Sequence, residues 1–472
     1  MQTYLLKYLL PSLIVIIASN ITLAQPMAPL PLGADSLRQP EPSSPAVREM
    51  APAMVPFKSE LPKSDVSLPA GEAQEPAVLY TIEEIQRIGL EANGLVQAAR
   101  SQINMAKAGV VAASAFLNPE VTVTAGPDSN RYSLAITGPT SMQRSVTVNQ
   151  PIENPFMRSA RINASEAIVD ASRASFDQVR ADLAAQLRVR AYELLLRQEQ
   201  ATIEQGIYDL LETLRNRIAA NVERGEVARF ELIRADTELQ SAANRAQAAR
   251  LTVQRARVLL LQLLAGAIPG NFQIRNSLKD PIQLPSLEEL REQVPKINPD
   301  VMRLQAEQER ANHRISQEKA SVLPQISVLY TNYQDAQFTS NIAGASVRIP
   351  IWYRRRGEID TAIHDSARIR ETLEFRRYEI SQLFEAAWQA LEIAQRRVDI
   401  FEGGLIKEAE NVVQVAQTAY RFGERGLIEF LDSQRIFRGI ISDSMLARFE
   451  LQSAAAEIDR LRAHYPKELI PE

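Results

Sequence analysis

The chain has 472 residues, 23% of them charged and only 6% aromatic, and its formal net charge is −4. Arginines are interspersed with acidic residues, which excludes the basic patch expected of a nucleic-acid-binding protein. The absence of cysteine excludes disulfides, thiolate metal sites and a lipid anchor on cysteine.

The first 79 residues are predicted to lie outside the folded part. Lys7, the apolar run Leu9 to Ala18 and the small residues before Gln25 are typical of a cleaved secretory signal over residues 1–24. The apolar run is shorter than the roughly 20 residues that a membrane-spanning helix needs. Eleven prolines in residues 26–76 indicate a flexible, Pro-rich leader, which we place at 25–79.

The next segment predicts a helix followed by two strands. The helix is expected from Thr81 to Phe116, because Thr81-Ile82-Glu83-Glu84 is a capping-box sequence and Asn118-Pro119 ends the pattern. Apolar and polar residues then alternate, with a turn expected at Gly126-Pro127-Asp128. The apolar positions of the two strands are Val121, Val123, Ala125, Tyr132, Leu134, Ile136, Val146 and Val148.

Between Pro155 and Pro269 the chain contains no proline, and this stretch predicts two long helices. A proline inside a helix costs about 3 kcal/mol, so long proline-free tracts rich in Ala, Leu, Glu and Arg favour helix. We expect a helix over residues 158–222, a reversal at Gly225 and a return helix over 226–264. A loop over 266–299 follows, with a short helix at 287–293.

The same plan is predicted a second time. Pro119 and Pro324 begin similar strand sequences 205 residues apart, and Gly225 and Gly423 mark similar reversals 198 residues apart. Such offsets indicate a tandem duplication. The expected elements of the second copy are a helix at 300–321, strands at 325–333 and 343–349, a long helix at 358–422 and a return helix at 427–464.

The four strands indicate how the protein could enter a membrane. In lipid every backbone donor and acceptor must be paired, and closed barrels begin at about eight strands, so several chains would have to share one barrel. Phe156, Trp352 and Tyr353 stand at the strand-to-helix junctions, where they predict a membrane-interface belt or ordinary packing. Arg354-Arg355-Arg356 either meets anionic groups or caps a helix start.

Across roughly residues 80–465 the chain resembles the TolC-like outer membrane factors. Its sequence motifs are most similar to those of their CzcC-like heavy-metal-efflux branch. The motifs that carry the resemblance are the duplicated strand pair, Gln150-Pro151-Ile152, Ile349-Pro350-Ile351, Arg356-Gly357-Glu358-Ile359, the reversals at Gly225 and Gly423, Ala191-Tyr192-Glu193-Leu194-Leu195-Leu196 and Gly225-Glu226-Val227-Ala228-Arg229-Phe230-Glu231-Leu232. The sequence departs from the family pattern at Glu153-Asn154-Pro155-Phe156-Met157-Arg158, where relatives have a glycine-containing turn.

The resemblance implies a mainly α fold with a small β portion. In it, long coiled-coil helices form a periplasmic α-barrel, and three chains each contribute four strands to a shared outer-membrane β-barrel. The implied function is a passive exit duct without a cofactor. The implied partners are two further copies of the chain, a periplasmic adaptor (membrane fusion) protein, an inner-membrane efflux pump and outer membrane lipid.

Two groups of site residues follow from the helical reversals. Arg224 before Gly225 and Arg421 before Gly423 either belong to simple turns or, as the resemblance implies, to tips that meet the adaptor's helical hairpins. The resemblance also maps a periplasmic gate onto Glu231, Tyr420 and Arg425.

Other chemistry is not supported by the sequence. His313, His364 and His464 have no metal-ligand spacing, and no phosphate loop, nucleophile elbow or cysteine nucleophile occurs, so neither a metal site nor an enzyme is expected. Two alternatives to an efflux duct stay open: the duct of a type I protein secretion system, and a non-conducting periplasmic coiled-coil scaffold.

The predicted organisation is summarised by residue ranges. The ranges are the signal peptide at 1–24, the leader at 25–79, the first repeat at 80–268, a linker or equatorial segment at 269–297, the second repeat at 298–465 and a C-terminal tail at 466–472.

Overall fold

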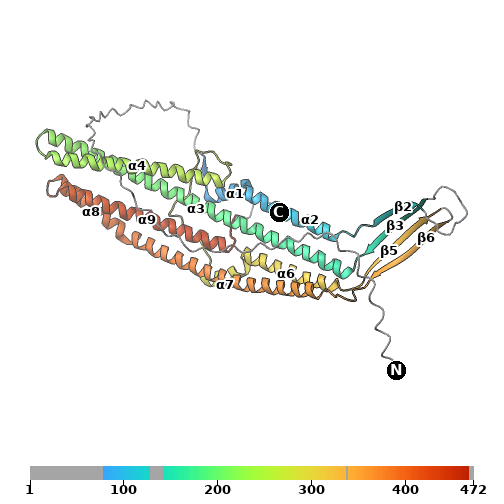
Figure 1. Ribbon diagram of the computed structural model, residues 1–472. Helices are drawn as coiled ribbons and strands as arrows, with labels where there is room; N and C mark the ends of the chain where they lie inside the picture. Colours follow the sequence, from blue (N-terminus) through green and yellow to red (C-terminus); the bar gives the residue numbers. More distant parts are fainter. Residues whose placement is uncertain (1–77, 128–141, 336–337, 467–472) are drawn as a thin grey trace, which may run out of the picture. The chain divides into compact units, whose positions relative to one another are not determined.

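Long antiparallel helices dominate the structure, a computed structural model that describes residues 78–127, 142–335 and 338–466 (Figure 1). These residues belong to one unit, and the predicted signal segment, almost all of the leader and the positions Tyr132, Leu134 and Ile136 lie outside them. The helices of the first repeat are α1 (Ile82–Ala92), α2 (Gly94–Ser114), α3 (Pro155–Glu223) and α4 (Arg229–Leu263). Those that follow are α5 (Leu287–Ile297), α6 (Pro299–Ala320), α7 (Arg356–Ile400), α8 (Ile406–Arg421) and α9 (Leu427–Leu461).

The helix predicted over 81–116 is interrupted, which corrects the sequence analysis. The capping box at its start is present, since the Thr81 side chain accepts from the Glu84 amide and the Glu84 carboxylate accepts from the Thr81 amide. At Asn93 the backbone is extended, and the Asn93 side chain caps α2 through the Leu95 amide. Its amide also donates to the Leu263 carbonyl at the end of α4, so a tertiary contact holds the break.

The second long helix is interrupted too, where an unbroken helix over 358–422 was predicted. Residues Phe401–Leu405 form a π-helical turn between α7 and α8, and Gly404 has φ 142° and ψ −21°. Only glycine adopts such a conformation readily. The first copy has no such break, and α3 continues for 69 residues, or roughly 100 Å.

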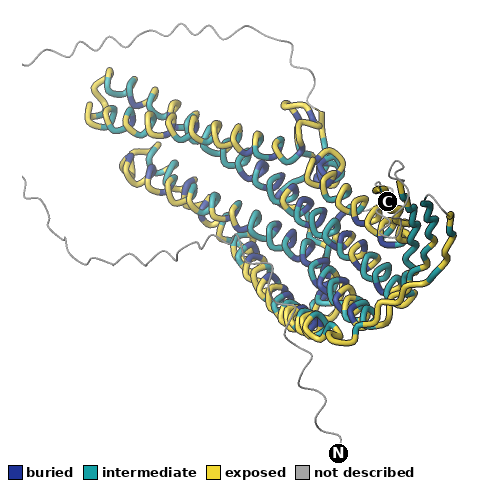
Figure 2. Tube along the Cα trace, turned by 45° about the vertical axis from the view of Figure 1, so that its right-hand side comes forward, coloured by how far each residue is buried: buried dark blue, intermediate teal, exposed yellow. Residues whose placement is uncertain are grey.

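The helices lie side by side in an order that contacts define. The long helix α3 packs against α2 and α4 on one side and against α6 and α9 on the other, and α7 packs against α6 and α9. Figure 1 shows the same order, and Figure 2 shows exposed positions recurring beside buried ones along the long helices. The outermost helices of this layer are therefore α2 and α4 at one edge and α7 and α8 at the other.

Four strands form one antiparallel sheet in the order β2-β3-β5-β6. Their bounds are β2 (Glu120–Pro127), β3 (Met142–Ile152), β5 (Gln325–Gln334) and β6 (Thr339–Arg348). Gly126 and Pro127 pair within β2, so the turn predicted at 126–128 does not begin there. β6 starts at Thr339, four residues before the predicted start. Within the described chain, β2 and β6 each pair on one side only.

The register gives the sheet two different faces, because directly opposite residues of antiparallel strands point to the same side. One face has the rows Val121-Val148-Tyr330-Ala343 and Ile152-Ile326-Val347, and it is mostly apolar. The other face has the rows Thr122-Thr147-Thr331-Ile342 and Thr124-Ser145-Tyr333-Ser340, and it is mostly polar. Several valines of the first face are exposed, with Val123 at 67% and Val347 at 51%, while Val146 and Val148 of β3 are half-buried.

A second, two-stranded sheet was not predicted. Its strands β1 (Leu79–Tyr80) and β4 (Gln273–Ile274) run parallel and join the start of the first repeat to the segment after α4. Around this junction Leu187, Leu260, Leu264 and Phe272 are fully buried. A separate apolar cluster joins α5, α6, α7 and α9, and a third joins the two helical reversals. Among the described residues, no helix combines the length and apolar character required to cross a bilayer.

Candidate functional site

The two helical reversals lie next to each other and form the candidate site. Gly225 and Gly423 have φ of 76° and 75°, the left-handed conformation that a tight reversal requires, so both predicted turns are confirmed. Buried apolar residues of both repeats pack between the reversals; they include Leu211, Ile218, Ala235, Val413, Leu427 and Phe430. Since these residues come from α3, α4, α8 and α9, the two hairpins form one packed end of the helical layer.

A cavity of about 820 Å³ opens between the reversals and brings the three gate candidates together. Glu231, Tyr420 and Arg425 all line it. They come from the first turn of α4, the end of α8 and the loop before α9. Residues almost two hundred positions apart therefore share one cavity.

Tyr420 is the most constrained of the three. Its ring stacks on Phe430 with centroids 6.0 Å apart and planes 12° from parallel. Burial, and secondarily the nearby Glu231 carboxylate, raise the pKa of the Tyr420 hydroxyl. Among the described residues, however, neither the Glu231 carboxylate nor the Tyr420 hydroxyl forms a hydrogen bond. The two groups are near each other but not linked within one chain.

Arg425 points to a different partner. Its guanidinium lies 3.4 Å from the Glu429 carboxylate, one turn further along the chain, and its side chain is 64% exposed. At the first reversal Arg224 also bonds locally, to the Glu226 carboxylate at 3.1 Å and to the Asn221 side chain. Arg421 is exposed at the second reversal and bonds with no other described residue.

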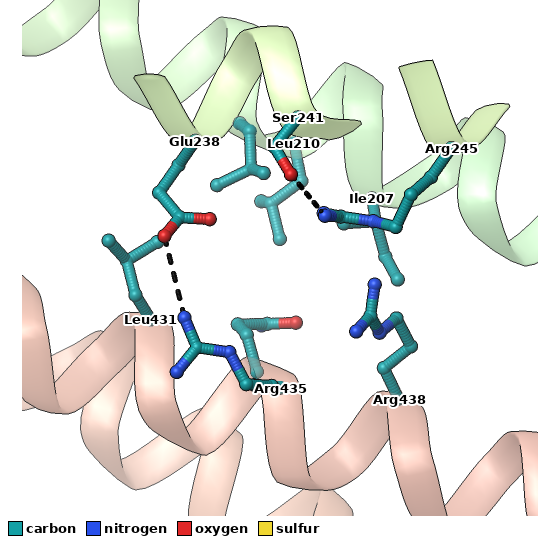
Figure 3. A pocket seen from close by; sticks show the side chains of 10 residues that line it. Ile207, Leu210, Glu238, Ser241, Arg245, Leu431, Arg435 and Arg438 are labelled. Atoms are coloured by element: carbon teal, nitrogen blue, oxygen red, sulfur yellow. Dashed lines mark hydrogen bonds and ion pairs between the residues drawn. The ribbon is translucent and has the colours of Figure 1, made fainter. Parts of the chain in front are cut away.

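Further from the reversals, charged residues link the two hairpins across a pocket of about 240 Å³ (Figure 3). Arg435 on α9 lies 3.4 Å from Glu238 on α4, and Arg438 lies 3.8 Å from Glu204 on α3. Arg245 also reaches Glu204, at 3.3 Å. The sequence analysis did not identify these pairs, because their partners are brought together only by packing.

The predicted belt residues lie at the opposite ends of the long helices, beside the sheet. Trp352 is 97% exposed, and Phe156 and Tyr353 are also exposed. The Tyr353 hydroxyl donates to the Glu358 carboxylate at 2.7 Å and accepts from the Gly357 amide at 3.1 Å. Tyr353 therefore fixes the first turn of α7, while the indole of Trp352 is left almost entirely free of protein contact.

Both strand-to-helix junctions are tied to α6 by polar contacts. In the second repeat Arg355, with φ 54°, donates to the buried Glu318 carboxylate of α6 at 2.6 Å. In the first, Asn154 caps α3 through the Phe156 amide and donates to the Ala320 carbonyl at 3.1 Å. Arg355 precedes the first residue of α7 without a side-chain hydrogen bond to the helix end, and its guanidinium binds Glu318 instead.

The π-helical turn has its own charged surroundings, which the sequence did not reveal. Arg448 of α9 donates to the Glu402 carboxylate at 2.9 and 3.2 Å. Burial raises the pKa of the nearby Glu199 carboxyl, and Arg448 and Lys279 oppose this effect. In the part of the chain that the structure describes, no group of three His, Asp or Glu side chains is placed to hold a metal ion.

Comparison with known proteins identifies the family. The model of the outer membrane efflux protein family matches residues 89–266 and 290–464, one match in each repeat. The cobalt-zinc-cadmium resistance protein CzcC of Cupriavidus metallidurans is 23% identical over 418 residues, covering 88% of this chain and 97% of that protein. The nickel-cobalt-cadmium resistance protein NccC of Alcaligenes xylosoxydans xylosoxydans is 26% identical over 321 residues, covering 66% and 69%.

Solved structures agree on the fold. CusC superposes with a TM-score of 0.70 at 16% identity, covering 83% of this chain and 95% of that one. The CmeC outer membrane channel of Campylobacter jejuni also gives a TM-score of 0.70, at 13% identity, covering 82% and 86%. The predicted TolC-like fold and the similarity to the CzcC-like branch are both confirmed. The chain belongs to the outer membrane efflux protein family, and it is a transport protein rather than an enzyme.

Proposed function

We propose that this protein is the exit duct of a tripartite efflux system and works as a homotrimer. In this arrangement a periplasmic adaptor protein and an inner-membrane pump deliver the cargo, and the duct conducts it passively across the outer membrane. The observation that carries the proposal is that the sheet and the helical layer each have two free edges, one on either side of the described chain. A neighbouring copy could pair with each of these edges.

The sheet supports ring closure. Strands β2 and β6 are the two edges of the four-stranded sheet, and an unpaired edge in lipid would leave backbone groups without partners. Three copies joined edge to edge form a closed barrel of twelve strands. Its exposed apolar face then meets lipid, and its face of threonines and serines lines a water-filled lumen.

The helices support the same assembly. Exposed apolar residues follow one stripe along α4, namely Phe230, Ile233, Leu251 and Val258. Another stripe follows α7, namely Phe375, Tyr378, Ile393 and Ile400. Within each stripe the spacing stays near whole helical turns. Because α4 and α7 are at opposite edges of the layer, the stripes fit a head-to-tail contact between copies, which closes into a ring.

The cargo is inferred from the relatives. CzcC and NccC are named for resistance to cobalt, zinc, cadmium and nickel, so we propose divalent heavy-metal cations as the substrate. A duct need not bind its cargo tightly, because a passage that holds an ion slows its exit. A strain without this protein is expected to become sensitive to cobalt, zinc and cadmium. Unchanged metal resistance with a new sensitivity to organic drugs would exclude this cargo.

Export is proposed through the predicted signal segment at residues 1–24. The mature chain is then held in the outer membrane by its strands alone, since no cysteine is available for a lipid anchor. Trp352, Tyr353 and Phe156, next to the sheet, fit the aromatic level at the periplasmic side of the membrane. The tips with Arg224, Gly225, Arg421 and Gly423 would face the adaptor.

The gate is proposed at Glu231, Tyr420 and Arg425. Burial and, secondarily, the nearby Glu231 carboxylate raise the pKa of Tyr420 within one copy, and exposed Arg425 would exchange its ion pair with Glu429 for a contact with the neighbouring copy. A charge-assisted hydrogen bond contributes about 1.5–3 kcal/mol, so losing one shifts a closed population by tenfold or more.

The test is single-channel recording of purified trimers in a planar bilayer. Glu231→Gln with Tyr420→Phe is expected to raise the conductance, because both substitutions weaken the closed arrangement without changing side-chain volume greatly. Glu408→Gln, an exposed acid on α8 outside the gate and without a partner among the described residues, is the matched control. Equal conductance of the wild type and the gate variant would remove the gate assignment, and a protein that is monomeric in detergent would overturn the duct itself.

A further inference from the structure

Two opposite charges stand unpaired on the two edge strands of the sheet. Glu120 is the first residue of β2 and Arg348 is the last residue of β6. Both side chains are exposed, and neither forms an ion pair or hydrogen bond with any other residue that the structure describes. Most of the other arginines in the second repeat do have an acidic partner, so this isolation needs an explanation.

The two charges lie on the same face. Glu120 pairs with Asn149, Asn149 with Leu329, and Leu329 with Gly344, and directly opposite residues point to one side of a sheet. Gly344 and Arg348 are four residues apart on β6, and side chains alternate with a period of two. Glu120 and Arg348 therefore share the polar face, the one that lines the lumen in the proposed barrel.

They also lie at the same end of the sheet, beside the helices. The rows of paired residues are staggered relative to the strand ends. The row that starts at Glu120, the first residue of β2, pairs with Asn149 of β3, which lies three residues before the end of that strand at Ile152. It crosses β6 at Gly344, four residues from the end at Arg348. From β2 to β6, each row of paired residues therefore lies further from the strand ends that adjoin the helices. This is the stagger that barrel closure demands.

Symmetry then brings the charges together. In a ring of identical copies every β2 begins at the same level, so the stagger continues across each seam in the same direction. The end of β6 therefore lies beside the first residues of β2 in the next copy. Across the seam, Arg348 then lies directly opposite Glu120 or one pleat away from it. The glutamate and arginine side chains are long enough to span that distance.

We propose that Glu120 of one copy and Arg348 of the next form an ion pair that sets the register of the seam between subunits. The inference rests on the trimeric duct proposed above. A one-residue slip would turn Arg348 away from the lumen and separate it from Glu120. An ion pair in a wet lumen adds little affinity, but it distinguishes the correct register from its neighbours.

Disulfide formation tests this contact without background, because the chain has no cysteine. The double variant Glu120→Cys, Arg348→Cys is expected to give covalent dimers and trimers on non-reducing gels after oxidation of outer membranes with copper phenanthroline. Two matched pairs are expected to stay monomeric on the gel. They are Val121→Cys with Arg348→Cys, which lie on opposite faces, and Glu120→Cys with Ser340→Cys, which share a face but lie at opposite ends.

A charge swap tests the ion pair itself. Glu120→Arg is expected to lower the fraction of detergent-resistant trimer severalfold, and the further change Arg348→Glu is expected to restore it. Trimers that form normally while Glu120→Cys and Arg348→Cys do not crosslink would overturn this inference and leave the duct standing. Failure of the unaltered protein to form trimers would instead overturn the duct.

Discussion

The contact that holds the second strand-to-helix junction is small enough to be tested with one substitution. The Glu318 residue is 3% exposed, and its carboxylate accepts from Arg355 at 2.6 and 3.2 Å and lies 2.7 Å from Arg314. Glu318→Gln preserves the size of the side chain. It removes the charge and replaces one acceptor oxygen by an amide NH₂ facing the guanidinium groups, so the link between the start of α7 and α6 is weakened.

The magnitude follows from burial and exposure. Removing one partner of a fully buried ion pair costs about 3–5 kcal/mol. Here the side chains of Arg355 and Arg314 are 37% and 58% exposed, so both guanidinium groups can regain water. We therefore expect the link to lose about 2 kcal/mol. That value corresponds to a roughly thirtyfold change in a local opening equilibrium.

Native-state hydrogen exchange measures this equilibrium directly. Amides in the first turns of α7, residues 356–362, are expected to exchange about thirty times faster in the Glu318→Gln trimer, while those near the reversals at Gly225 and Gly423 stay unchanged. The control is Glu371→Gln, an exposed acid whose ion pair is with the adjacent Arg370. Protection of residues 356–362 that matches the control would refute the reasoning.

Two further predictions concern stability. Gly404→Ala places a side chain at φ 142° and is expected to lower the free energy of unfolding by about 1–3 kcal/mol, seen as a lower melting temperature. Gly403→Ala, in the same turn, is expected to leave the melting temperature unchanged. Equal melting temperatures of the two variants would contradict backbone strain at Gly404. At Asp300, burial is outweighed by hydrogen bonds from Arg303 and Arg376, which hold its pKa below the ordinary value. Its stabilisation is therefore complete above that value and lost as pH falls through the folded pKa. Melting curves from pH 3 to 7 should show that the wild type loses stability below about pH 4 and that Asp300→Asn loses less. The same pH dependence in both proteins would contradict this role of Asp300.

Much of the fold could be predicted from the sequence because it depends on local patterns. Long proline-free tracts, a capping box at Thr81 and alternating residues in the strands each determine an element within a short window. The reversals at Gly225 and Gly423 were equally readable, since a left-handed turn between helices favours glycine. The duplicated motifs then identified the family, which the comparisons confirmed.

The interruptions of the helices could not be predicted from local sequence patterns. Asn93 and Gly404 are both tolerated inside helical patterns, and the break at Asn93 depends on a distant partner, the Leu263 carbonyl. The parallel pair β1 and β4 has two residues in each strand, too few to give a pattern. Arg425 was assigned to the gate by resemblance, and its contact within the chain, with Glu429, could not be predicted from the sequence.

The amino-acid sequence by itself determined the elements, their duplication and the family, because helix, strand and turn preferences act between neighbouring residues. Only the tertiary structure decided which charges meet, as for Glu318 with Arg355 and Glu238 with Arg435, and which are left alone, as for Glu120 and Arg348. The physical reason is that an ion pair depends on distances of a few ångströms between side chains far apart in the chain, and packing alone sets those distances.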